Sequence, residues 1–197
     1  MPALHLLGTG SAVTDAHRTT TMLALEDEGH ALLIDCGGDA FQRARMAGID
    51  PDCIDGLIIT HEHPDHVAGF PLLILRIWQT GRSRPIPVYG PPSALAQAQR
   101  LLNAFHTDGW DLPEIQWITV DPDSPDPFIA TAQFEISAGP GCHSVPVIGL
   151  RCVHRPSGFV VGYSCDTEPC DSMQNLLDGS DLIVHEATGA VRGHTSA

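Results

Sequence analysis

Short apolar runs separated by polar loops cover most of the chain. Runs of four to eight apolar or β-branched residues, bounded by Gly, Asp, Ser or Thr, are typical of β-strands. This pattern predicts strands at residues 4–10, 20–26, 30–38, 55–60, 86–90, 115–120, 128–138, 146–153, 158–164 and 181–187.

Three other segments have the spacing of helices. In the clearest of them, 93–105, apolar residues recur at steps of three and four from Leu95 to Phe105. We expect Ser93 to cap this helix, because a serine hydroxyl accepts hydrogen bonds from the free N–H groups of a first turn. The remaining predicted helices are 67–79 and 170–179.

The order of these elements predicts the fold class. The strands fall into two runs, with helices between them and at their ends. We therefore expect an α/β protein, an αββα sandwich of two mostly antiparallel sheets flanked by helices, in which residues 1–197 form a single domain. In such a layout the loops at one edge of both sheets converge, so residues distant in sequence can share one site.

Composition narrows the class further. The 197 residues are 43% hydrophobic and 17% charged, as in a globular protein, and no apolar run is long enough to span a bilayer. The N-terminal sequence "MPALHLLGTGSA" has neither the positive lead nor the long apolar segment of a secretory signal. We expect a cytoplasmic protein with no membrane partner.

The charge balance argues against nucleic acid as a partner. Ten arginines, no lysine and 24 carboxylates give a formal net charge of −14, which repels a phosphate backbone. Arg76, Arg82 and Arg84 are the best candidates for a local basic patch, but the preferred interpretation is a solvated helix end. The six cysteines form no CxxC pair, so we expect free, buried thiols; Cys142 and Cys165, next to candidate metal ligands, are alternatively soft ligands themselves.

One short stretch carries the strongest chemical signal. The sequence "THEHPDH" at 60–66 places three histidines and two acidic residues directly after a predicted strand. In a tight loop His61 and His63 can point toward one ion, and Asp65 and His66 toward a second. A polar loop with local hydrogen bonds is the alternative. Further candidates are His143 in a Gly-Pro loop and Asp166 just after a strand. Asp35 at the end of 30–38 either hydrogen-bonds a ligand histidine or forms a turn.

With these motifs in place, the chain resembles the metallo-β-lactamase superfamily, and within it the branch related to tRNA 3′-endonuclease, ribonuclease Z. The matching pieces run nearly end to end. They are "LLGTGSA" (6–12), "LLIDCGG" (32–38), "ITHEHPDHVAGFPLL" (59–73), "PVYGPP" (87–92), "HSVPVIGLR" (143–151), "GYSCDTEPC" (162–170), "DLIVHEATG" (181–189) and "GHTSA" (193–197). "GYSCDT" departs from the usual S-G-D-T, because Cys165 stands in place of glycine.

The resemblance implies a set of roles. Two zinc ions, with manganese as an alternative, would activate a hydroxide for attack on a phosphorus or carbonyl centre. Asp65 would also orient that hydroxide, and Glu186 and His194 would handle the proton of the leaving group. A flexible C-terminal histidine is the alternative for His194. The implied metal ligands are His61, His63 and His143 for one ion, Asp65 and His66 for the other, and Asp166 as the bridge.

Two departures from the family shape the expected function. Family members continue beyond the "GHTSA"-like segment and supply a last histidine ligand, so we expect a C-terminal truncation at Ala197 and a missing C-terminal strand. The stretch between His143 and Asp166 also leaves no room for the long arm with which the tRNA-processing enzymes of the branch grip tRNA. We therefore expect a zinc-dependent hydrolase of small anionic esters, most of all phosphodiesters such as cyclic nucleotides or cyclic sugar phosphates.

Three alternatives stay open. The first is tRNA 3′-endonuclease activity of the ribonuclease Z type, with the arm supplied by a partner subunit. The second is arylsulfatase-, lactonase- or thioesterase-like hydrolysis on the same metal centre, which the ligand set does not distinguish. The third is a non-catalytic protein that keeps the fold for binding or assembly. The resemblance also implies a homodimer.

Overall fold

The chain divides into two compact units. A computed structural model describes residues 1–189 and 191–196, and its two units are Met1–Thr119 and Val120–Ala197. No helix in the described part of the chain has the length and apolar composition that a membrane crossing requires.

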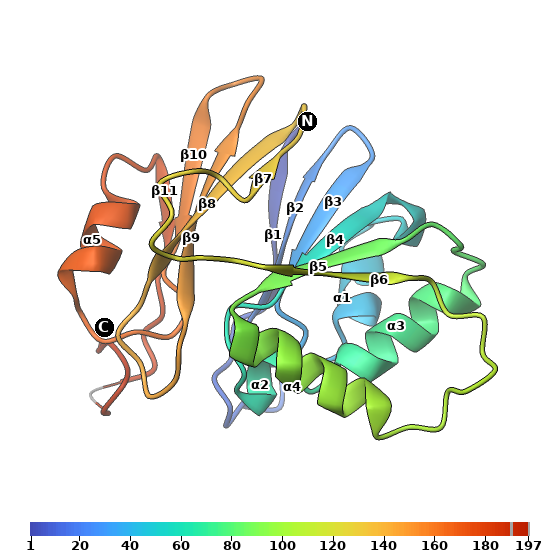
Figure 1. The fold of residues 1–197 in the computed structure, drawn as a ribbon. Coiled ribbons are helices and arrows are strands. Elements are labelled where there is room, and N and C mark those ends of the chain that lie inside the picture. Colours follow the sequence, from blue (N-terminus) through green and yellow to red (C-terminus); the bar gives the residue numbers. More distant parts are fainter. Residues whose placement is uncertain (190, 197) are drawn as a thin grey trace. The chain divides into compact units, whose positions relative to one another are not determined.

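The first unit is built on one six-stranded sheet (Figure 1). In spatial order its strands are β1 (Ala3–Gly8), β2 (Met22–Asp27), β3 (His30–Ile34), β4 (Ile54–Ile58), β5 (Ile86–Gly90) and β6 (Ile115–Thr119). The first two pairings are antiparallel and the next three are parallel. The prediction of a mostly antiparallel sheet is therefore wrong for this unit, because helical crossovers, which parallel strands require, connect β3 through to β6.

Helices cover one face of this sheet. They are α1 (Ala40–Met46), α2 (Pro64–Val67), α3 (Phe70–Gln79) and α4 (Pro92–Asn103), with a 3₁₀ turn, η1, at Pro51–Cys53. Phe70 and Ile74 of α3 are fully buried in a core with Leu33 and Val88 of the sheet. The predicted helix at 67–79 is thus confirmed over 70–79, as α3. The motif "THEHPDH" precedes α3 and its last residues lie in the short helix α2.

Two helix predictions need correction. Helix α1 was not predicted, because its seven residues are too few to display a long apolar stripe; the Asp39 carboxylate caps it by accepting from the N–H of Gln42 at 3.0 Å. Helix α4 begins after Pro91 rather than Ser93, whose hydroxyl has no hydrogen-bond partner. Phe105 lies beyond the last turn and is 60% exposed, so it does not extend the apolar stripe.

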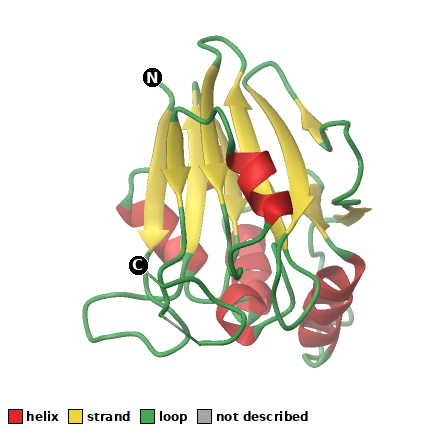
Figure 2. Ribbon diagram, turned by 90° about the vertical axis from the view of Figure 1, so that its left-hand side faces the viewer, coloured by secondary structure: helices red, strands yellow, loops and turns green. Residues whose placement is uncertain are grey.

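The second unit is built on a five-stranded sheet with one helix (Figure 2). In spatial order the strands are β11 (Leu182–Val184), β10 (Phe159–Tyr163), β9 (Ile148–His154), β8 (Phe134–Pro140) and β7 (Ile129–Ala130). Only the β10–β11 pairing is parallel, so the prediction of a mostly antiparallel sheet is confirmed here. The strand predicted at 128–138 is a hairpin, since Thr131 N–H donates to the Phe134 carbonyl at 2.8 Å across a tight turn that contains no glycine or proline.

Helix α5 (Asp171–Leu177) packs on β8, β9 and β10. Glycines in the strands allow this close approach. A Cβ on Gly149 of β9 would lie only 2.6 Å from the sulfur of Met173, and one on Gly162 of β10 would lie 2.7 Å from Leu177. The helix therefore rests directly on the backbone of the sheet, and the loop that precedes it, 164–170, is held at the end of β10.

Candidate metal centre

The loop "THEHPDH" leaves β4 and runs straight into α2. Thr60 and His61 are fully buried, and His66 is 2% exposed. Pro64 occupies the first turn of α2, where its fixed φ favours the helix and its missing N–H costs nothing. The loop and α2 together carry four candidate ligands within six residues of the chain. The hydrophobic pattern predicted the strand before the loop, β4, but not α2.

The imidazoles of this cluster are in contact. His61 Nε2 lies 3.1 Å from His63 Nδ1, and the ring centroids of His61 and His66 are 4.0 Å apart. Two nitrogens bound to one tetrahedral zinc at its usual bond length would lie about 3.3 Å apart. The spacing of His61 and His63 therefore fits a shared ion, and the donor set of imidazole and carboxylate suits zinc or manganese.

Asp35 determines which nitrogen His66 presents. Its carboxylate, fully buried, accepts a hydrogen bond from His66 Nδ1 at 2.8 Å and others from the N–H and hydroxyl of Thr60. The bond to the carboxylate places the proton on Nδ1, so the lone pair of a neutral His66 is on Nε2, which lies 3.7 Å from an Asp65 oxygen. Of the two interpretations offered for Asp35, the structure shows the hydrogen bond to a candidate ligand histidine; its φ of +61° also places the residue in the left-handed region at the end of β3.

The backbone around Asp35 is tightly fitted to α2. Cys36 N–H donates to the His66 carbonyl at 2.8 Å, and Gly69 N–H donates to the Cys36 carbonyl at 2.8 Å. A Cβ on Gly37 would overlap the carbonyl group of Asp65. The end of β3 and the start of α2 thus pass so close that only glycine fits between them.

A second group of candidate ligands lies in the second unit. His143, Asp166 and His194 offer ligand atoms that all lie within 4.8 Å of one another. His143 comes from the loop between β8 and β9, Asp166 follows β10, and the rings of His143 and His194 meet edge to face with centroids 5.0 Å apart. These three residues, predicted separately, are therefore brought together.

Glu186 anchors the segment that carries His194. One of its carboxylate oxygens accepts from the N–H groups of Thr167 and Thr195, at 2.9 and 3.1 Å, and from His194 Nδ1 at 3.1 Å. The other oxygen accepts from Thr188 N–H at 3.0 Å. Because the carboxylate fixes the proton of His194 on Nδ1, the Nε2 atom of a neutral His194 is left as the proton acceptor.

Three polar residues of the site were missed from the sequence. Thr60 bridges Asp35 and His61, Thr167 accepts a hydrogen bond from Cys142 N–H at 2.9 Å, and Glu168 accepts one from Gly193 N–H at 2.6 Å. Each stands next to or near a candidate ligand in the chain. Each of the three has a partner about 25 residues away in the chain. In the sequence, therefore, only their position beside the motifs could have marked them as site residues.

The backbone conformation of Cys165 is one that favours glycine, the residue of the S-G-D-T motif that the chain resembles. Its φ is +51°, in the left-handed region where a side chain costs roughly 1–2 kcal/mol, and its side chain is fully buried. The residue thus holds the strained turn that leads from β10 into Asp166.

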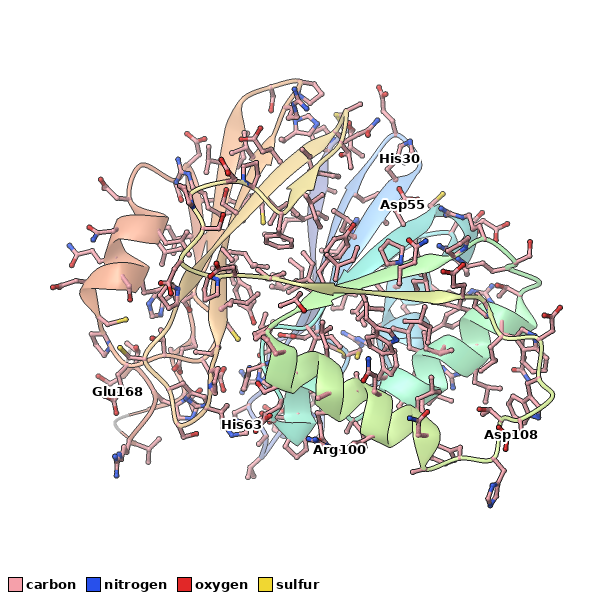
Figure 3. All side chains as sticks on the ribbon, viewed as in Figure 1. His30, Asp55, His63, Arg100, Asp108 and Glu168 are labelled. Carbon is pink, nitrogen blue, oxygen red and sulfur yellow. The ribbon has the colours of Figure 1, made fainter. Side chains whose placement is uncertain are left out.

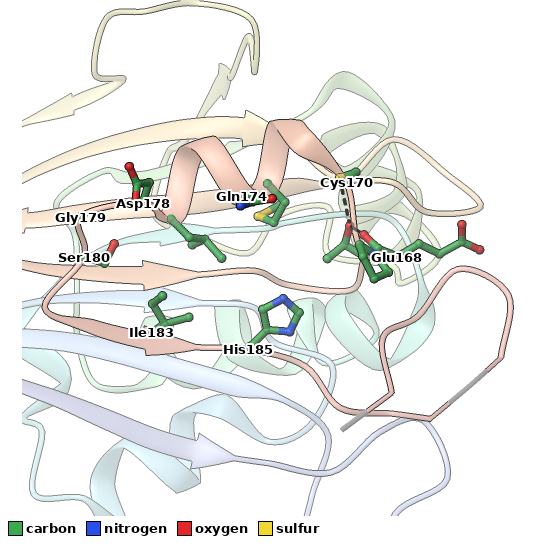
Figure 4. Close-up of a pocket in the computed structure, with 12 residues that line it drawn as sticks. Glu168, Cys170, Gln174, Asp178, Gly179, Ser180, Ile183 and His185 are labelled. Carbon is green, nitrogen blue, oxygen red and sulfur yellow. Dashed lines mark hydrogen bonds between the residues drawn. The ribbon is translucent and has the colours of Figure 1, made fainter.

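The six cysteines are free, as predicted, but only Cys36, Cys152 and Cys165 are buried. Cys170 lines a groove between α5 and β11, together with Met173, Ile183 and others (Figure 4). Burial raises the pKa of the Cys170 thiol, but hydrogen bonds, led by that from Ser172, outweigh it and lower the pKa to about 7. The pKa of the Cys36, Cys53, Cys142 and Cys152 thiols is raised instead, so Cys170 is more acidic than these four.

The three arginines proposed as a basic patch are all engaged. Arg82 is 6% exposed and donates to backbone carbonyls, while Arg76 pairs with Asp39 and Arg84 with Asp55. Asp55 in turn accepts a hydrogen bond from His30 at 2.7 Å; both residues are labelled in Figure 3. Neither interpretation offered for the three holds for Arg82, which is buried and links the start of β4 to the segment that precedes β5.

Comparisons with known proteins agree with this geometry. Ribonuclease Z from Mycolicibacterium gilvum is 30% identical over 192 residues, which are 91% of this chain and 66% of that protein, so the chain spans just under two thirds of that relative. Human tRNase Z, short form (ELAC1), superimposes with a TM-score of 0.81 at 24% identity, over 100% of this chain and 85% of that one. A structure described as a new diphosphatase from the PhnP family gives a TM-score of 0.72 at 21% identity, over 100% and 79% of the two chains.

Fold and site together define a metallo-β-lactamase-fold protein of the ribonuclease Z-like hydrolase branch, with a histidine-rich metal site. The predicted fold class and family resemblance are thereby confirmed. Within this class the assignment is narrower, because the sequence profile of the family described as "Anti-Pycsar protein Apyc1" matches residues 2–196. The chain belongs to the Apyc1 family.

Proposed function

We propose that the protein is a metal-dependent phosphodiesterase that hydrolyses small phosphodiesters, with cyclic nucleotides as the leading substrates. The observation that carries this proposal is the buried histidine cluster, in which Asp35 holds His66 ready for a metal. Membership of the Apyc1 family and the likeness to a diphosphatase direct it toward small phosphate esters.

The proposed ligands follow the motifs. We assign His61, His63 and His143 to one ion, Asp65 and His66 to the other, and Asp166 to both, with zinc as the first choice and manganese as the second. Such ions, when bound, activate water and neutralise phosphoryl oxygens. The residues of the chain orient the ligands: Asp35 fixes the tautomer of His66, and Thr60 contacts both Asp35 and the Nδ1 atom of His61.

His194 supplies the proton step in this proposal. With its proton held on Nδ1 by Glu186, the Nε2 atom would take up the proton that the attacking water releases and then give it to the departing alkoxide. An imidazole suits this work because its pKa lies close to neutral. Asp65 orients the attacking water.

Two features favour a small substrate over tRNA. The chain between β8 and Asp166 consists of a loop, β9, a tight turn closed by the Gly158 N–H donating to the His154 carbonyl at 2.8 Å, and β10, so it holds no arm. The net charge of −14 opposes binding of a long polyanion.

The test is hydrolysis of bis-p-nitrophenyl phosphate and of 3′,5′-cyclic nucleotides with added zinc or manganese. We expect turnover that a chelator abolishes and that His66→Gln lowers at least 100-fold. His30→Gln is the matched control, because His30 also bonds a carboxylate in the first unit but is half-exposed and distant from the motif. No turnover of any phosphodiester by the metal-loaded protein would reject the proposal.

The identity to ribonuclease Z supports one alternative, tRNA 3′ processing. Cleavage of precursor tRNA after the discriminator base, at a rate above that for cyclic nucleotides, would make it the better assignment.

A further inference from the structure

His143 is held by a backbone carbonyl. Its Nδ1 lies 2.7 Å from the Gly193 carbonyl oxygen, and its ring is partly buried. A carbonyl oxygen can only accept, so the proton of a neutral His143 is on Nδ1 and the lone pair is on Nε2. The tautomer of His143 therefore depends on where residue 193 lies.

Gly193 is placed by local constraints. Its φ is +89°, and a Cβ there would lie 3.0 Å from His143 Nδ1, so the position requires glycine. Its N–H donates to Glu168 Oε1 at 2.6 Å. The two successive peptide groups that meet at Gly193 are therefore both held, the first through its N–H by a carboxylate and the second through its carbonyl by the imidazole.

Glu168 is bound to both segments. Its own N–H donates to the Cys142 carbonyl at 2.7 Å, directly before His143, while its side chain accepts from Gly193 N–H. One residue thus connects the loop that carries His143 with the segment that orients it.

We propose that Glu168 is a positioning residue that, through Gly193, fixes His143 in the Nδ1-protonated tautomer and so prepares Nε2 as a metal ligand. The functional part of this inference rests on the proposed role of His143, but the tautomer itself does not. Residues that orient a metal-binding histidine typically contribute 10- to 100-fold to metal affinity.

The experiment is long-range proton–nitrogen correlation NMR on metal-free protein with ¹⁵N-labelled histidine. It is recorded at about pH 8.5, where imidazoles are neutral, and His143 is assigned from the signals that His143→Gln removes. We expect Nδ1–H for His143 in the wild type and in Glu168→Gln, whose amide oxygen still accepts from Gly193. Glu168→Ala should give a mixture of tautomers and a 10- to 100-fold weaker zinc affinity by chelator competition.

An unchanged His143 tautomer in Glu168→Ala would overturn the inference. Gly193→Ala gives a second route, since its Cβ would displace the carbonyl and shift the tautomer while Glu168 stays intact. Both measurements are made without metal or substrate. A protein that hydrolyses no phosphodiester can therefore still confirm the role of Glu168, and an active one can refute it.

Discussion

The two units build their polar clusters in different ways. In the first unit, His61, His66 and Asp35 are at most 2% exposed and are attached to the ends of β3 and β4. In the second, the side chains of Asp166 and His194 are 15% and 20% exposed and depend on bonds between loops. The first cluster is therefore part of the folded core, whereas the second can rearrange without unfolding the sheet beneath it.

The largest expected effect comes from removing the carboxylate on which the first cluster depends. Asp35→Ala should lower the free energy of unfolding by about 3 kcal/mol, because His66 and Thr60 lose a buried acceptor. Asp35→Asn keeps the left-handed backbone and one acceptor, and should cost about half as much. Urea unfolding followed by circular dichroism measures both; equal stability of wild type and Asp35→Ala would show that the first cluster is not part of the core.

The corresponding change in the second unit should spare stability and affect chemistry. His194→Gln should lower kcat about 100-fold, since proton transfer is lost, while the free energy of unfolding stays within about 0.5 kcal/mol of wild type because the residue is partly exposed. Steady-state kinetics and urea unfolding on the same preparation decide the point. A large loss of stability with unchanged kcat would reverse the comparison between the units.

The thiols offer a smaller contrast of the same kind. Cys170 in the second unit has a pKa lowered to about 7, whereas burial, followed by the nearby carboxylates, raises the pKa of Cys53 in the first. The thiolate is the reactive form, so alkylation of Cys170 should increase as the pH rises through about 7 and then level off. At pH 7 Cys170 should react about five- to tenfold faster than Cys53, after allowance for its lower intrinsic nucleophilicity. Mass spectrometry of peptides alkylated with iodoacetamide gives both rates, and equal rates would contradict the assignment.

The smallest effect would widen the stability difference. The hairpin between β2 and β3 turns through Glu28 and Gly29, with φ of +49° and +81°. Asparagine tolerates this backbone better than glutamate, and Asn-Gly is the favoured pair for such turns. Glu28→Asn should therefore stabilise the protein by about 0.5 kcal/mol, measured as a shift in the urea midpoint. A destabilised variant would mean that the Glu28 side chain contributes more than the strain costs.

Local patterns predicted much of this structure. Strand-sized apolar runs located β1 to β6, and the position of "THEHPDH" after a predicted strand indicated a rigid loop. The pattern suggested that Asp35 bonds a histidine of the motif but could not show that the partner is His66, because the two are brought together by the parallel pairing of β3 and β4. Nor could it show Glu186 as an anchor, since its partners are backbone N–H groups that every sequence has.

Errors arose where local signals were weak. The apolar run at 128–138 hides a turn because Ala132 and Gln133 lack the glycine or proline that marks most turns. Ser93 has a side chain that can cap a helix. The helix nevertheless begins at Pro92 with Pro91 as its N-cap residue, two positions before the expected cap.

The close passage at Gly37 has a consequence for protein engineering. Transplanting only residues 60–66 onto another scaffold would carry the candidate ligands without the segment 35–38, which holds their backbone and side chains in place. The smallest unit to transplant consists of two segments, 35–38 and 60–69, because their backbones pack directly against each other at Gly37 and Gly69. A grafted site that lacks either segment would have the same residue types in a loop whose conformation nothing fixes.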